Sequence, residues 1–170
     1  MPRVFAGLAI GHLIVLIGAY GLGWAVSVLG AQRHVLLGVF ALLLAALCQA
    51  VVITYFAATR KMMSQAVGVA HMEATPILTL ALLKRTATRW MAAQMVLLVC
   101  VAATGATAWR SGSFSVSHTG LATLLLLLQA WVYWRQYALI SMNASLLERT
   151  MRAHSLRKES WEAGGSDAPA

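Results

Sequence analysis

The stretch VLLGVFALLLAALCQAVVITYFAATRK, residues 35–61, decides the fold class of this chain. Its apolar part, Val35–Thr59, includes no charged side chain, and the basic pair Arg60-Lys61 follows directly. About 20 apolar residues in an α-helix cover the roughly 30 Å of hydrocarbon in a bilayer. The stretch therefore predicts a transmembrane helix that ends at a basic membrane–water boundary.

Other apolar runs predict three more spans. The expected spans are residues 4–29, 35–59, 90–109 and 118–137. The first run is too long for the apolar region of a typical signal peptide, so we interpret it as a true span. The composition agrees, because 60% of the 170 residues are hydrophobic and only 11% are charged, about half the charged fraction of a soluble domain. We expect an all-α, polytopic membrane protein with four transmembrane helices in an up-down bundle.

The basic residues predict the orientation of these helices. If the N-terminus is cytoplasmic, all Lys and Arg residues except Arg33 and Arg110 fall on the cytoplasmic side. The positive-inside rule favours that arrangement, so we expect both termini in the cytoplasm and a location in the bacterial inner membrane. The basic residues that give the net charge of +8 flank the apolar runs. Their position indicates contact with the lipid bilayer and argues against nucleic-acid binding. Arg135 and three aromatic residues are the expected anchors at the inner interface: Trp131, Trp134 and Tyr137.

The cytoplasmic side holds most of the chain outside the membrane. In the inner connection, residues 60–89, Thr75-Pro76 is typical of a helix start. It predicts a helix near residues 76–88 that lies in the membrane interface, with its continuation into the third span as the alternative. We expect the fourth helix to extend into the cytoplasm, which makes residues 1–158 one transmembrane domain and residues 159–170 a flexible tail.

Polar residues inside the spans are the first candidates for function. His12, Gln49, Gln94 and Gln129 fall in the inner half or the middle of the membrane. Polar groups are expensive in lipid, so they are expected to meet in one buried cluster. Such a cluster either fixes how the helices pack or lines a path through an oligomeric transporter or channel. The two helical hairpins show no repeated pattern, which weakens the transporter hypothesis.

Histidines at the outer ends of two spans are the second candidate. His34 and His118 open the second and fourth spans at equal depth, as the two axial ligands of a b-type haem in a four-helix bundle require. Histidines are also ordinary residues at a headgroup interface. His12 has no partner histidine at its own depth, so it would ligate haem only with a different ligand or across a dimer.

Signatures of catalysis are absent from the sequence. No acidic residue lies in a span, and there is no nucleophile elbow, phosphate-binding loop or zinc-protease motif. The cysteines Cys48 and Cys100 both fall in apolar runs and indicate neither a metal site nor covalent haem. The leading hypothesis is a non-catalytic scaffold or accessory subunit of a larger membrane complex, with other membrane-protein subunits as partners. A small transporter and a b-type haem electron-transfer subunit are the alternatives.

Overall fold

The computed structural model describes residues 1–69, 73–111 and 116–164. These residues are helical, with no strand among them, and four of their helices are long and apolar enough to cross a membrane. The all-α class and the four apolar helices are thereby confirmed. The protein is a multi-pass membrane protein by the length and composition of these helices.

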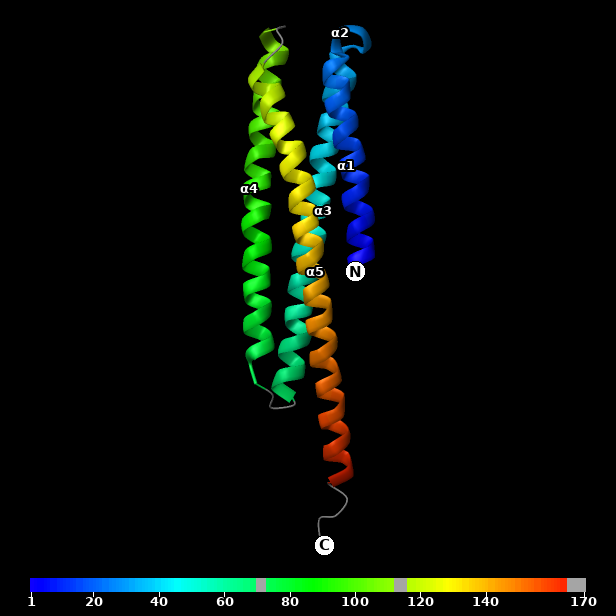
Figure 1. Ribbon diagram of the computed structural model, residues 1–170, viewed down its shortest axis with the longest axis vertical. Helices are drawn as coiled ribbons and strands as arrows, with labels where there is room; N and C mark the ends of the chain where they lie inside the picture. The colour runs from blue at the N-terminus through cyan, green and yellow to red at the C-terminus, as the bar shows by residue number, and fades with distance from the viewer. Residues whose placement is uncertain (70–72, 112–115, 165–170) are drawn as a thin grey trace.

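The helices follow one another with short connections. In order along the chain they are α1 (Pro2–Trp24), α2 (Val26–Leu29), α3 (Ala31–Val69), α4 (Thr75–Ser111) and α5 (Val116–Gly164). The turn between α2 and α3 uses Gly30 at φ 82°, a backbone conformation that glycine adopts without strain. Figure 1 shows the four long helices side by side, with α5 continuing well beyond the ends of the others.

The helix expected near residues 76–88 is the first part of α4, and the structure adopts the alternative in which it continues into the third span. No break separates it from the third span, because α4 is continuous from Thr75 to Ser111. One apolar stripe at helical spacing explains the continuity. Its buried residues are Leu80, Leu83, Ala87, Met91 and Leu98. The segment therefore packs along the bundle with the rest of α4.

The C-terminal boundary also differs from the sequence-based expectation. Helix α5 runs to Gly164, past residue 158, because no glycine or proline occurs between Gly120 and Gly164. Glu148 and Arg152 form an ion pair one turn apart on its surface. Of the predicted tail, residues 165–170 lie outside the described part of the chain.

The apolar core is divided into two clusters. The larger one lies toward the C-terminal end of α3 and includes Phe5, Phe56, Met63 and Ile140. The smaller one lies toward the N-terminal end of α3 and is built on Ala45, Leu98 and Leu125. Glutamines from three helices lie at the levels of these two clusters, and His34 and His118 lie beyond the smaller one.

Candidate functional site

The two histidines at the end of the bundle that holds the α2–α3 turn lie next to each other. His34 stands near the start of α3 and His118 near the start of α5. Their ring centroids are 6.0 Å apart, and the ring planes are nearly perpendicular, at 82°. The structure thus brings together the two residues that the sequence indicated as a pair of haem ligands.

Each imidazole ring is held by a backbone carbonyl of the preceding long helix. Nδ1 of His34 lies 2.8 Å from the carbonyl oxygen of Ala19, and Nδ1 of His118 lies 3.1 Å from that of Val101. A carbonyl oxygen only accepts hydrogen bonds, so each Nδ1 carries the proton. In a neutral ring the lone pair is then on Nε2, which is the arrangement that metal-binding histidines adopt.

A glycine packs behind each of the two rings. A Cβ added at Gly23 would stand 3.2 Å from Cε1 of His34, and one added at Gly105 would stand 2.9 Å from Cε1 of His118. Each glycine follows the carbonyl that holds the ring by four residues, or about one helical turn. A Cβ at Gly105 would therefore force the ring to shift, whereas one at Gly23 would make a tight contact that a small movement of the ring could relieve.

These contacts repeat between the two halves of the chain. Residues of α1 correspond to residues of α4 that are 82 positions later: Ala19 and Val101, Gly23 and Gly105, His12 and Gln94. Residues of α3 correspond to residues of α5 that are 84 positions later: His34 and His118, Gln49 and Tyr133, Thr59 and Asn143. The hairpins α1–α3 and α4–α5 are thus related by an approximate two-fold relation, and the histidine pair lies where the halves meet.

Sequence reasoning missed this repeat because most equivalent positions differ in residue type. Of the six pairs named above, the glycine and the histidine are identical, with 11 positions from Gly23 to His34 and 13 from Gly105 to His118. That spacing across the connection between two helices was the available signal. Three of the other four pairs exchange one polar residue for another, and the fourth exchanges alanine for valine.

A polar layer occupies the middle of the bundle. Nε2 of Gln49 donates to Oε1 of Gln94 at 3.0 Å, and Nε2 of Gln136 donates to Oε1 of Gln49 at 2.8 Å. At the equivalent place in the other half, the hydroxyl of Tyr133 and Nδ1 of His12 are 2.6 Å apart. The polar layer thus joins helices from both hairpins.

The four residues expected to form one cluster, His12, Gln49, Gln94 and Gln129, therefore do not all contact one another. Two of them bond to each other, and the other two lie beside Tyr133. Gln49 pairs with Gln94, whereas His12 pairs with Tyr133. Gln129 is fully buried beside Tyr133, and its amide makes no hydrogen bond of ordinary geometry.

All four of these residues face the interior of a single chain. The side chains of His12, Gln94 and Gln129 are fully buried, and Gln49 is 4% exposed. They consequently do not face a passage between copies of the protein. The ring of His12 likewise does not reach a surface at which a second copy would provide a haem ligand.

The expected interface anchors lie on the outside of the bundle. Trp134 and Tyr137 are exposed, and Trp131 packs edge-on against Trp90 at 4.4 Å between ring centroids. The guanidinium carbon of Arg135 lies 5.9 Å from the Trp131 ring, within the range of a cation–π contact.

Further chemistry is sparse in the described part of the chain. It includes no group of three or more metal-ligating side chains, and both cysteines are free, Cys48 buried and Cys100 exposed. Comparison of the chain with protein-family models, curated proteins and solved structures gave no match. A functional proposal for this membrane protein consequently depends on its own geometry.

Proposed function

We propose that this protein is an electron-transfer subunit of the bacterial inner membrane that binds one b-type haem between His34 and His118. The observation that carries the proposal is the matched pair of rings, each oriented by a backbone carbonyl and separated by 6.0 Å. Metal–nitrogen bonds of about 2 Å on both sides, together with the ring radii, give roughly this separation for two imidazoles on one metal ion.

The number of donors favours haem over a bare metal ion. Structural zinc and similar sites take four protein ligands, whereas haem iron needs only two axial ones. The described residues offer two histidines here and no third ligand group. Two imidazoles in an apolar bundle therefore match haem best.

The surroundings of the pair are small and apolar. Gly38 follows His34 by one helical turn, and nothing lies within 4 Å of the place where its Cβ would be. Ala122 occupies the equivalent place in α5, and the smaller core cluster, which includes Leu98 and Leu125, lies below. An apolar setting of this kind suits the body of a porphyrin and tunes its potential.

Haem would supply one-electron exchange between ferric and ferrous iron, with other one-electron carriers as donor and acceptor. The carbonyls of Ala19 and Val101 keep each Nδ1 protonated and orient the ligand atoms. Because no substrate site accompanies the pair, the subunit would work beside partner subunits, as the accessory-subunit hypothesis also expects. The first test is the absorption spectrum of protein purified from haem-replete cells. A colourless preparation would contradict haem binding and would favour the scaffold hypothesis.

Replacing Gly105 with alanine is expected to reduce the haem content of the purified protein. The new methyl group would stand 2.9 Å from His118 Cε1 and would push the ring off its carbonyl. The haem content per chain and the midpoint potential measure the effect. Gly120→Ala is the matched control, because a Cβ there meets nothing within 4 Å, and an equal loss of haem in both variants would contradict the proposal.

The proposed topology is an up-down bundle with both termini, and the extension of α5, in the cytoplasm. In a variant with Cys48 and Cys100 replaced by alanine, we expect Gln32→Cys to react with a membrane-impermeant maleimide in intact spheroplasts. Ser155→Cys is expected to react only after permeabilisation. Both positions are exposed, so the side of the membrane on which each cysteine lies decides whether it reacts. The reverse labelling pattern would indicate the opposite topology.

A further inference from the structure

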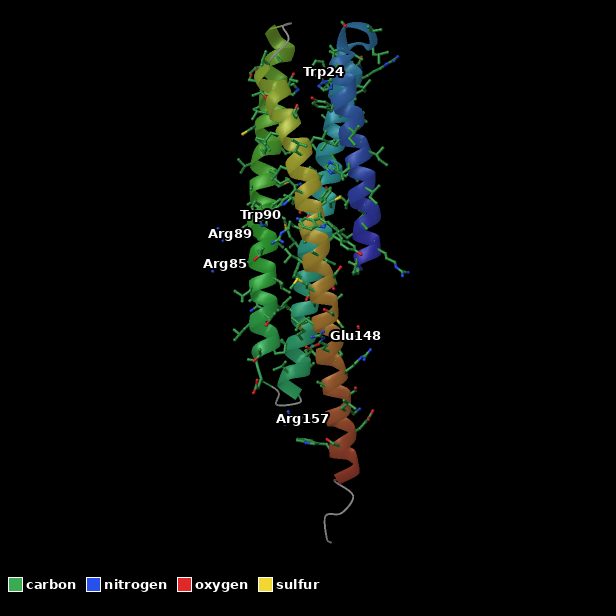
Figure 2. All side chains as sticks on the ribbon, in the orientation of Figure 1. Trp24, Arg85, Arg89, Trp90, Glu148 and Arg157 are labelled. Atoms are coloured by element: carbon green, nitrogen blue, oxygen red, sulfur yellow. The ribbon has the colours of Figure 1, made fainter. Side chains whose placement is uncertain are left out.

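A basic groove lies between α3 and α4 on the inner side of the bundle. It encloses a cavity of about 410 Å³. Arg60 reaches it from α3, and Lys84, Arg85 and Arg89 reach it from α4. Figure 2 shows Arg85 and Arg89 one above the other on the side of α4 that faces away from the other helices, so these two residues border the groove.

These four cations have no anionic partner in the described part of the chain. The ion pair found there joins Glu148 to Arg152 on α5. Arg60 is more than 20 residues away from Lys84 in sequence, yet both line the same cavity. Orientation by the positive-inside rule requires basic residues on one side of the membrane only, so it does not explain their convergence on one groove.

The remaining lining of the groove is mostly small and apolar. Leu80, Ala81 and Ala92 belong to it, and the 12 residues from Leu80 to Ala92 correspond to about 18 Å of helix. Val96 and Val99 continue the exposed surface of α4 toward the membrane centre. The surface of the groove is thus mostly apolar, with the four cationic groups at its rim, and it opens onto an apolar helix surface at its membrane end.

We propose that this groove binds an anionic phospholipid, with preference for one whose headgroup carries two phosphates. Basic pockets between transmembrane helices on the cytoplasmic side are suited to such headgroups, and guanidinium groups bind phosphate through paired hydrogen bonds. Two phosphates offset the four positive charges more fully than one phosphate does. The acyl chains lie along Ala92 and Val96, and the bound lipid ties α3 to α4. This proposal does not depend on haem binding.

Lipid titration of the delipidated, full-length protein in an uncharged detergent, followed by native mass spectrometry, tests the proposal. We expect diphosphatidylglycerol to bind more tightly than phosphatidylglycerol, and phosphatidylcholine to bind least. Arg85→Gln/Arg89→Gln is expected to weaken diphosphatidylglycerol binding about 30-fold, the effect typical of two basic residues lost near an anionic lipid. Arg3→Gln/Arg149→Gln removes the same charge from exposed positions outside the groove and is expected to change the affinity less than about threefold.

A second pair of variants tests the apolar end of the groove. Ala92→Trp fills it and is expected to weaken lipid binding, whereas Ala93→Trp places the same side chain on an exposed neighbouring position outside the lining. Equal binding of all three lipids, or equal losses in the two arginine double variants, would overturn the proposal. Displacement of the lipid by an equal concentration of inorganic pyrophosphate would also overturn it, because the site would then recognise phosphate alone. Unchanged thermal unfolding of each variant shows that folding is retained.

Discussion

Replacing either His34 or His118 with alanine is expected to abolish the Soret band of the purified protein. Each substitution removes one axial ligand, and a b-type haem has no covalent link to keep it in place. The remaining histidine would then be the single axial ligand, although the proposed site is formed by both rings. The absorption spectrum and the haem content per chain measure the outcome.

Two further variants separate ligation from a structural role of the histidines. His154→Ala changes a histidine on the distant part of α5 and is expected to leave the spectrum unchanged. His118→Met is expected to raise the midpoint potential where haem is retained, because a thioether axial ligand favours ferrous iron. Retention of the full parental spectrum in both alanine variants would eliminate the proposed site.

Replacing Gln49 with leucine is expected to cause a large loss of stability. Gln49 donates to Gln94 and accepts from Gln136, so the substitution removes two hydrogen bonds between helices and leaves both partners unsatisfied. Such bonds in membrane proteins contribute about 0.6 kcal/mol on average and up to about 1.7 kcal/mol. The free energy of unfolding should therefore fall by roughly 1–3 kcal/mol. Unfolding in mixed micelles with increasing dodecyl sulfate measures it.

The neighbouring Gln129 provides the control for this prediction. It is as deeply buried as Gln94, but its amide makes no hydrogen bond of ordinary geometry. Gln129→Leu is expected to be nearly neutral or stabilising, since it removes a buried polar group that lacks a partner. Gln49→Leu/Gln136→Leu should recover part of the loss caused by Gln49→Leu, because it removes the stranded donor. Equal losses for Gln49→Leu and Gln129→Leu would show that the hydrogen bonds of Gln49 make no additional contribution to the free energy of unfolding.

The hydrogen bonds of the polar layer influence how the histidine pair is positioned. Apolar helices in lipid gain little from burying one face rather than another, so hydrogen bonds between helices fix their rotation and register. The bonds around Gln49 and between His12 and Tyr133 link the two hairpins. That registration helps to set the distance between His34 and His118, on which the proposed haem ligation depends.

The apolar runs by themselves determined the four long helices, because the thickness of the hydrocarbon layer fixes the minimum length of a span. The sequence also selected His34 and His118 as a pair, since two residues that follow outer turns lie at similar depth whatever the packing. The sequence left open whether the helix near residues 76–88 continues into the third span, because charges such as Lys84 and Arg85 look like the end of a helix when its buried face is unknown.

Only the tertiary structure decided which side chains meet across the bundle. Residues that face lipid and residues that face the core are both apolar here, so the sequence does not show how each helix is rotated about its axis. The pairing of His12 with Tyr133, the double role of Gln49 and the glycines behind the two histidines all depend on that rotation. The relation between the two halves was hidden for the same reason, because the equivalent positions share contacts and mostly differ in residue type.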